Sequence, residues 1–490
     1  MKSLEKGGFY MKEKRIFAFA LCIVMSMSLS SCTVADYVNS LDMQGTHATT
    51  KKPPVYTLET SAYDTTMTTL GTTLFADGAD FGLSEVVIPK KPKITPVAMK
   101  TADAEKLKIS DDLISKDVDV SAGIAKNRGK LTLEGMTTVS SSKSSDTAES
   151  RFFGTSAAFL CMPSSQIDIK DSVITTTGNG TAACFAYGTG SVIDISQSEI
   201  MTQNTNARAL ASTYHGNIYA AGSKISTNGM NSPAVFIGVN GGTIAVTGGE
   251  ITTFGISSPA IYSEGTASLT GVKIKTSSSE AAVIEGKNSV SLTGCDIDTS
   301  STTFTLYRSN SGETTKGLAT LNIVGGKIDA KSGALFYVAN TDAKIYLQAV
   351  EIDSNSSSLV NVVANEKWGE VGKNGGKADI VANFQNLEGD IYADNLSEVK
   401  LELSALSTFE GTINSRNTAK QADIILDGTS KWILTGNSFV SSITPGMADF
   451  SNIKDNGYTI YYDADNPTNV YLNGETITLK DGGLLTPMKK

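Results

Sequence analysis

Two aspartates in matching surroundings, Asp168 and Asp194, are the first residues in this sequence whose spacing suggests chemistry. Each stands between two isoleucines, and carboxylates on neighbouring strands could share a calcium ion, which takes oxygen ligands. At the next matching positions the chain has Tyr219 and Ala245, followed by serines, so the acidic pattern ends there. The arginines of this region do not stand at matching positions of successive repeats, so they supply no catalytic base beside the aspartates. We therefore predict no metal ion and no cofactor.

The spacing of the other carboxylate, histidine and cysteine residues also predicts no catalytic site. An inverting glycosidase would need two carboxylates that flank the scissile bond, about 6.5–9.5 Å apart. His215 is one of only two histidines in the chain, which excludes a multi-histidine metal site, and we interpret it as a loop residue. Cys161 and Cys184 are expected to face inward as small packing residues, since no base that would activate a thiol stands nearby. We predict no catalytic residue.

Binding has a better candidate in residues 365–376, a glycine-rich insertion that carries Trp368 with Lys367 and Lys373 on either side of it. An exposed tryptophan can stack on the face of a sugar or anchor a protein partner. The alternative is that Trp368 folds back and covers the edge of the neighbouring structure. The long loop at residues 309–317 is a further candidate, although it has no chemical signature.

A repeat that begins at about residue 131 would position these side chains. An isoleucine recurs mostly every 23 to 26 residues, and five residues before it stands another small or apolar residue. The isoleucines of this column are Ile174, Ile200, Ile225, Ile251, Ile274, Ile297, Ile328 and Ile352. Apolar and polar residues alternate within each copy with a period of two, which is typical of β-strands. The spacing of the two apolar residues is the same in every copy, whereas the length of the rest of the copy varies. This predicts strand–turn–strand units joined by loops of unequal length.

Further columns accompany the isoleucines. Five copies have a glycine three residues before the isoleucine, where we expect a bend with positive φ. Threonine recurs two residues after the isoleucine, and an alanine eight or nine residues after it marks a third strand. Three short strands per repeat, with like residues at matching positions, predict a parallel β-helix in which each coil is completed by the next. We expect an all-β fold of roughly 13 such coils.

Charges alternate in sign immediately before the isoleucine column. The residues at this position are Glu199, Lys224, Glu250, Lys273, Asp296, Lys327 and Glu351. If the coils stack about 4.8 Å apart, these side chains are direct neighbours, and opposite charges there each contribute a few tenths of a kcal/mol. We interpret the column as a solvated ladder of charges and not as a catalytic cluster.

The N-terminus predicts export. Lys12, Lys14 and Arg15 precede an apolar stretch of 14 residues, which is shorter than the roughly 20 residues that a membrane-spanning helix needs. The stretch ends in Leu-Ser-Ser followed by Cys32, and this resembles the lipobox of bacterial lipoproteins, in which the cysteine is lipidated and becomes the first mature residue. The alternative is an ordinary signal peptide that ends near a chance cysteine. A lipid on Cys32 would anchor the chain at the cell envelope, in the outer membrane or at the cell surface.

Five segments follow from these patterns. We predict a signal peptide at 1–31, a tether at 32–54, an irregular N-terminal segment or cap at 55–130, a parallel β-helix at 131–440, and a C-terminal coil with a cap at 441–490. Removal of 1–31 takes away five of the 41 basic and two of the 50 acidic side chains, so the net charge falls from −9 to −12. That acidity argues against a nucleic-acid partner, which requires a cationic surface.

The repeats resemble the right-handed parallel β-helix proteins of the pectin-lyase-like class, and more closely the repetitive passengers of bacterial surface adhesins. Residues 178–183 and 280–286 carry this resemblance, because they have the pattern of strand and turn residues seen in those proteins. The resemblance implies an adhesin-like lipoprotein that binds a glycan or a host surface, or that has a structural role, without catalysis. The alternative is a polysaccharide-active lyase or hydrolase, although the paired aspartates and the Gly-His-Gly and Arg-Ile-Lys signatures of such hydrolases do not occur here. A shared pattern of strands and turns is strong support for the fold and weak support for the function.

Overall fold

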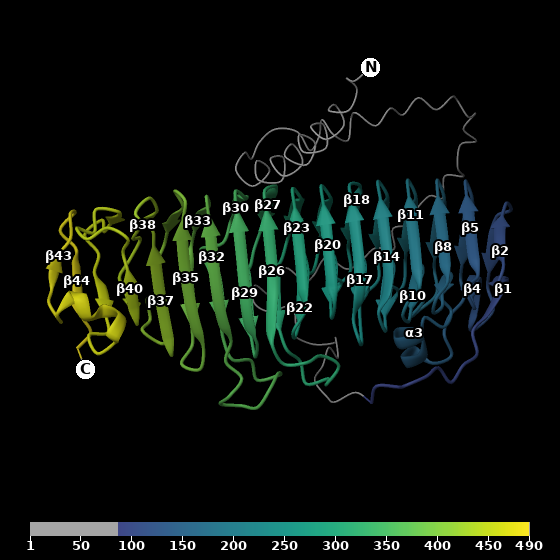
Figure 1. Ribbon diagram of the computed structural model, residues 1–490, viewed down its shortest axis with the longest axis horizontal. Helices are drawn as coiled ribbons and strands as arrows, with labels where there is room; N and C mark the ends of the chain where they lie inside the picture. The colour runs from purple at the N-terminus through teal and green to yellow at the C-terminus, as the bar shows by residue number, and fades with distance from the viewer. Residues whose placement is uncertain (1–86, 490) are drawn as a thin grey trace, which may run out of the picture. The chain divides into compact units, whose positions relative to one another are not determined.

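A computed structural model describes residues 87–489 of the chain, and these form a stack of parallel β-coils (Figure 1). The solenoid has about 16 turns, with 48% of the residues in strands and 3% in helices. This confirms the all-β parallel solenoid that the sequence predicts, with somewhat more coils than the expected 13. The predicted signal peptide at 1–31, Cys32 and the tether at 32–54 lie outside the described residues.

Sheet A takes one strand from each of the first twelve coils. Its strands in spatial order are β1 (Val97–Asp103), β4 (Val120–Lys126), β7 (Phe159–Cys161), β10 (Cys184–Tyr187), β13 (Leu210–Thr213), β16 (Val235–Ile237), β19 (Ile261–Ser263), β22 (Ala282–Glu285), β25 (Phe304–Tyr307), β28 (Phe336–Ala339), β31 (Ser358–Val362) and β34 (Asp390–Ala393). Strands β7, β13, β16, β19, β22 and β25 are buried at every residue. A strand that is buried on both faces must be covered from outside the solenoid as well as from within.

Sheet B is the longest of the sheets, with fourteen parallel strands. They are β2 (Lys106–Ile109), β5 (Lys130–Glu134), β8 (Gln166–Lys170), β11 (Val192–Ser196), β14 (Gly216–Ala221), β17 (Gly242–Thr247), β20 (Thr266–Thr270), β23 (Ser289–Thr293), β26 (Leu318–Val324), β29 (Asp342–Gln348), β32 (Lys377–Asn383), β35 (Glu398–Ser404), β37 (Gln421–Leu426) and β40 (Ser442–Thr444). Buried and more exposed residues alternate along these strands, as in β5 and β20. One face of sheet B therefore lines the core, while the other meets solvent.

Sheet C completes each of the first ten coils. It contains β3 (Leu113–Ser115), β6 (Thr137–Ser140), β9 (Val173–Thr176), β12 (Glu199–Thr202), β15 (Lys224–Thr227), β18 (Glu250–Thr253), β21 (Lys273–Thr276), β24 (Asp296–Thr299), β27 (Lys327–Ala330) and β30 (Glu351–Ser354). The predicted isoleucine column lies here in continuous register, from Ile174 to Ile352. All of these isoleucines except Ile352 are at most 2% exposed.

The last coils form two smaller sheets. Sheet D contains β33 (Asn386–Glu388), β36 (Thr408–Glu410), β38 (Lys431–Ile433) and β41 (Ile453–Lys454). Sheet E contains β39 (Ser438–Val440), β42 (Ile460–Tyr462), β44 (Leu484–Pro487) and β43 (Ile477–Thr478), and a 3₁₀ helix, η1 (Pro467–Leu472), precedes β43. Strand β43 pairs with β44 in the antiparallel direction, which interrupts the parallel stacking at this end.

The solenoid begins earlier than the sequence predicts. Strands β1 to β4 lie within 55–130, the segment expected to be an irregular layer or cap, and β1 pairs with β4 over most of its length. The isoleucine column starts only at residue 174, so these first coils have no column by which to recognise them. Residues 55–86 of that segment lie outside the described residues.

The bend before each isoleucine adopts positive φ in all eight copies of the repeat, between 48° and 62°. Five copies have glycine there, as predicted for such a bend, and the others have Asp171, Gln197 and Ala349. An L-residue with a Cβ atom costs about 1–2 kcal/mol in this left-handed conformation. At Gly271 a Cβ atom would meet no other atom within 4 Å, so conformation alone decides its effect.

Opposite effects are therefore expected from two substitutions in this column. Gly271→Ala should lower the free energy of unfolding by about 1 kcal/mol, and Ala349→Gly should raise it by a similar or smaller amount. Urea denaturation followed by circular dichroism measures both. Shifts of the two midpoints in the same direction would contradict the conformational explanation.

The charge ladder stands in the predicted register on the outside of sheet C. Each of its six neighbouring pairs, from Glu199 and Lys224 to Lys327 and Glu351, is a strand-to-strand pair. Within the described residues, Lys327 and Glu351 are the pair of this ladder close enough for a direct ion pair, at 3.0 Å. Exposed pairs of this kind contribute between 0 and about 1 kcal/mol, so the ladder favours the register without contributing much stability.

Candidate functional site

Asp168 and Asp194 are neighbours in sheet B, as their equivalent positions predict. The side-chain amide of Gln166 donates to both carboxylates, at 2.7 Å and 3.1 Å, and Lys130 forms an ion pair with Asp168 at 2.5 Å. These contacts satisfy the carboxylates with protein groups. Across residues 87–489, no group of three or more histidine, cysteine, aspartate or glutamate side chains is placed to hold a metal ion.

The two cysteines considered as nucleophiles lie in the core. Cys161 and Cys184 are completely buried, and burial raises the pKa of both thiols, that of Cys161 to about 12. A thiol with so high a pKa does not form the reactive thiolate near neutral pH. His215 lies in the loop between β13 and β14, in the left-handed conformation with φ of 69°, and it is exposed.

Trp368 is not the exposed aromatic residue that ligand binding would require. Its side chain is 2% exposed, and its ring centroid lies 4.2 Å from that of Tyr307 on sheet A. The structure therefore shows the alternative, in which the tryptophan folds back over a coil. Lys373 is exposed and pairs with Glu370 at 2.8 Å, while Lys367 is half-buried. Burial of the tryptophan removes the basis for a sugar-binding site around these two lysines.

Two long insertions pack against each other beside sheet A. We call residues 308–317 the latch loop and residues 364–376 the tryptophan loop. The Asn310 side chain in the latch loop donates to the carbonyl oxygen of Lys367 at 3.0 Å and accepts from the backbone N–H of Gly369 at 2.7 Å. Asn374 donates to the carbonyl oxygen of Trp368 at 2.8 Å and so holds the tryptophan loop closed. The buried ring of Trp368 is thus part of the support for the latch loop.

Cover for the outer face of sheet A comes partly from helix α3 (Thr147–Phe153), an insertion between β6 and β7. Asp146 caps the helix by accepting from the backbone N–H groups of its first turn, and the helix ends at Gly154 with φ of 72°. The ring of Phe153 stacks on that of Tyr214, with centroids 5.6 Å apart. The outward residues beneath form one apolar cluster, which includes Ile124, Leu160, Phe185, Ala211, Phe236, Tyr262, Val283 and Tyr307.

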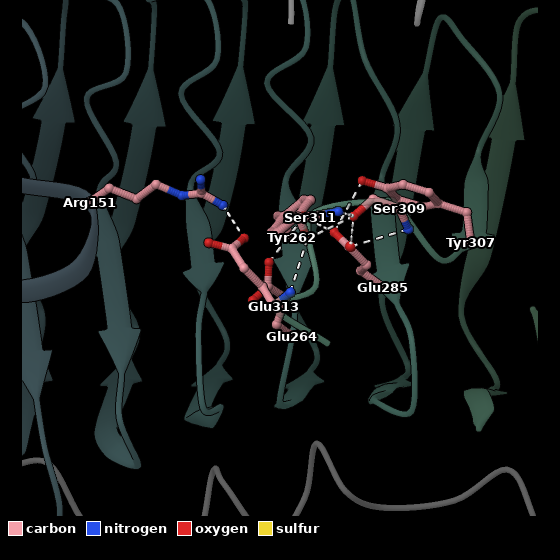
Figure 2. Close-up of polar contacts among 8 residues, drawn as sticks. All are labelled: Arg151, Tyr262, Glu264, Glu285, Tyr307, Ser309, Ser311 and Glu313. Atoms are coloured by element: carbon pink, nitrogen blue, oxygen red, sulfur yellow. Dashed lines mark hydrogen bonds and ion pairs between the residues drawn. The ribbon is translucent and has the colours of Figure 1, made fainter. Parts of the chain in front are cut away.

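Three glutamates and an arginine form a polar network on this covered face (Figure 2). Glu285, 1% exposed, accepts from the hydroxyl groups of Tyr262, Tyr307 and Ser309, and also from the backbone N–H of Ser309. Tyr262 also lies 3.2 Å from Oε1 of Glu264. A phenolic hydroxyl has a single hydrogen, so Tyr262 can donate a full hydrogen bond to only one of these two carboxyl groups.

Glu313 projects from the latch loop into the same network. It forms an ion pair with Arg151 of helix α3, and its carboxyl group is a close neighbour of that of Glu264. Burial raises the pKa of Glu264 well above its ordinary value, and Glu285 and Glu313 raise it further by repulsion. Burial also raises the pKa of Glu313, although Arg151 opposes this. Both pKa shifts favour the neutral form of these buried carboxyl groups.

Two arginines lie over this surface. Burial opposes the charge of Arg151, but Glu313 and Glu264 outweigh that effect and raise the pKa of its guanidinium. Arg208 is 7% exposed and lies over the ring of Phe236, 4.4 Å from its centroid. Burial and the nearby Arg151 lower the pKa of Arg208 to about 9, so that it remains charged at neutral pH.

A polar groove of about 560 Å³ opens beside this network, at the turn between sheets A and B. One wall is a row of aligned outward residues on five successive strands of sheet B, namely Asn217, Thr243, Thr266, Ser289 and Thr320. The other wall includes Lys287, Glu264 and residues 313–315 of the latch loop. Hydroxyl, amide and backbone groups therefore dominate a lining that crosses five coils.

The buried carboxyl pair is badly placed to cleave a glycosidic bond. Catalysis requires two carboxyl groups about 5–5.5 Å apart in a retaining glycosidase, or about 6.5–9.5 Å apart in an inverting one. Glu264 and Glu313 are instead buried side chains, 4% and 9% exposed. The oxygen atoms Oε2 of Glu264 and Oε1 of Glu313 are also shielded from solvent. The pair therefore forms a largely buried part of the groove wall.

The sequence analysis missed Glu264, Glu285 and Glu313. A signal existed for two of them, because Glu264-Gly265 and Glu285-Gly286 both stand where the third strand of consecutive coils ends. Glu313 had no such signal, since its loop stands outside the repeat and meets Arg151 across 162 residues.

None of the helices in the described part of the chain has the length and apolar character needed to cross a membrane. Comparison of the chain with protein-family models, with curated proteins and with solved structures finds no match.

Proposed function

We propose that this chain is an exported, lipid-anchored surface protein that binds a glycan without cleaving it. The single observation that carries the proposal is the polar groove across five coils. A lining of hydroxyl and amide groups suits a ligand rich in hydroxyl groups, since each ligand hydroxyl can donate and accept hydrogen bonds. Lys287 lines the groove with Glu264 and Glu313, whose raised pKa values favour their neutral forms, so the charges of the groove nearly balance and favour a neutral oligosaccharide over a polyanion.

Binding to the groove can be tested with an array of neutral oligosaccharides, followed by calorimetry on the full chain. Thr266→Ala removes a groove hydroxyl group and should weaken binding roughly three- to tenfold, because one hydrogen bond contributes about 0.5–1.5 kcal/mol. Thr270→Ala is the matched control, since Thr270 is an exposed residue of the same strand outside the groove. Equal affinities of the two variants, or no binder on the array, would reject the groove as the site.

Export and lipidation rest on the lipobox-like sequence that ends at Cys32. We expect metabolic palmitate labelling of the full chain in a bacterial host, and we expect Cys32→Ser to abolish it. Cys161→Ser is a suitable control, because that thiol is buried in the solenoid core. Labelling that persists in Cys32→Ser would show that the cysteine is not the site of attachment.

A second candidate function is cleavage of a polysaccharide, and one observation favours it. The raised pKa of Glu264 supplies a carboxylic acid at the groove, as a general acid requires. Incubation with acidic and neutral polysaccharides, assayed for new reducing ends and unsaturated products, separates the two functions. Turnover that disappears in Glu313→Gln would replace the binding proposal with an enzymatic one.

A further inference from the structure

The latch loop forms part of the groove wall, and its position depends on polar contacts that can change. Glu313, Thr314 and Thr315 of this loop line the groove. The carbonyl oxygen of Thr315 accepts from the backbone N–H of Lys287 at 3.1 Å, which ties the loop to the turn that follows β22. Movement of the latch loop would therefore change the shape of the groove directly.

Hydroxyl groups connect the loop backbone to the buried carboxylates. Ser309 donates to Glu285 from both its N–H and its hydroxyl group, and the Ser309 hydroxyl in turn accepts from the backbone N–H of Ser311 at 3.1 Å. The Ser311 hydroxyl accepts from the backbone N–H of Glu313 at 3.2 Å. The amide groups of these three residues thus report whether the loop is seated.

Charge at the buried end of the loop is balanced only while a proton is present. The ionisable groups that interact with Glu313 are Arg151, Arg208, Tyr214, Glu264 and Glu285. His215 and Lys287 line the same groove. Arg151 is the direct cationic partner of Glu313. Loss of that proton would leave Glu313 and Glu264 as two neighbouring buried negative charges, which repel each other.

We propose that residues 308–317 are a proton-dependent latch, seated on sheet A while Glu264 and Glu313 share a proton and released when that proton is lost. The movement of the loop requires no ligand. Its consequence, a groove whose affinity for a glycan falls as pH rises, rests on the proposed function.

The direction of the pH effect follows from the pKa values of the two carboxyl groups, which are raised in the folded protein above their ordinary 4.5. A raised pKa contributes stability that is fully present below the unfolded value and is lost as pH rises through the folded value. The latch should therefore be closed in mild acid and should open toward alkaline pH. Arg208 does not interfere below pH 8, because its pKa is about 9.

Hydrogen exchange of the full chain without ligand tests the latch. After correction for intrinsic rates, the amides of Ser309, Ser311 and Glu313 should exchange at least tenfold faster at about pH 8 than at about pH 5.5. Glu264→Gln keeps the size of the side chain and cannot ionise, so this difference should shrink to less than twofold. Thr270→Ala changes an exposed residue of β20 outside the groove and should leave the tenfold difference intact.

Two results would overturn the latch: equal exchange of wild-type amides at the two pH values, or a full pH response in Glu264→Gln. Protection of sheet B amides shows whether a variant is folded, and Glu313→Gln replaces Glu264→Gln if that variant is not. Equal exchange of the wild-type amides would overturn the latch even if neither variant folds. Failure to find a glycan ligand would leave this result unaffected, which separates it from the proposed function.

Discussion

Glu285→Ala is expected to lower the free energy of unfolding by about 4 kcal/mol. Its carboxylate accepts from two tyrosine hydroxyl groups and from both donors of Ser309, in a position that is 1% exposed. Each buried donor that loses its acceptor costs roughly 1–3 kcal/mol. Relief of the repulsion between Glu285 and the other glutamates offsets part of that loss. Urea denaturation of the full chain measures the total.

Two further variants separate lost hydrogen bonds from lost volume. Glu285→Gln retains a side-chain oxygen as an acceptor and should cost about half as much as the alanine variant, or less. Glu351→Ala removes an exposed carboxylate from the charge ladder and should cost less than about 1 kcal/mol. If Glu285→Ala were as mild as Glu351→Ala, the buried network would not be holding the latch loop to sheet A.

Trp368→Ala should be the second strongly destabilising change, with a loss of about 3–5 kcal/mol. Removal of a fully buried aromatic side chain forfeits its transfer free energy and leaves a cavity. Here the cavity would open between the tryptophan loop and Tyr307, whose ring lies 4.2 Å away. Hydrogen exchange should show lost protection in both long loops, since Asn310 of the latch loop bonds to the backbone on either side of Trp368.

Lys373→Ala is the control from the same loop, because its side chain is 74% exposed and its partner Glu370 is 70% exposed. A change of less than 0.5 kcal/mol is typical of such surface positions. A tryptophan that bound sugar would show the reverse behaviour, with unchanged stability and lost affinity in Trp368→Ala. That outcome would restore the ligand-binding role that the sequence suggests.

The parts of the fold that repeat could be predicted from the sequence. The isoleucine column, the bends three residues before it and the alternating charges all depend on contacts between neighbouring coils. Such contacts leave a signal at a regular spacing, because each coil faces the next in the same register. The first coils, from Val97 to Ser140, have no such columns, which explains why the sequence places the start of the solenoid at 131.

The candidate site could not be predicted in the same way, because it forms where the repeat is interrupted. Helix α3 and the latch loop are insertions, and their contacts with sheet A depend on how far each insertion reaches in space. Trp368 illustrates the difficulty, because a tryptophan in a glycine-rich loop can either expose its ring to a ligand or bury it against a coil. Only its contact with Tyr307 distinguishes the two.

The ion pair between Arg151 and Glu313 also bears on how the solenoid would respond to mechanical force. A solenoid that is pulled from its ends unravels coil by coil, because each coil is held only by its neighbours. Arg151 and Glu313 are 162 residues apart, and their contact closes across the strands β7 to β25. The ion pair therefore links the two ends of this stretch of coils. Under force the linked coils should unfold together in one large extension step, while the coils beyond them unfold one at a time in small steps.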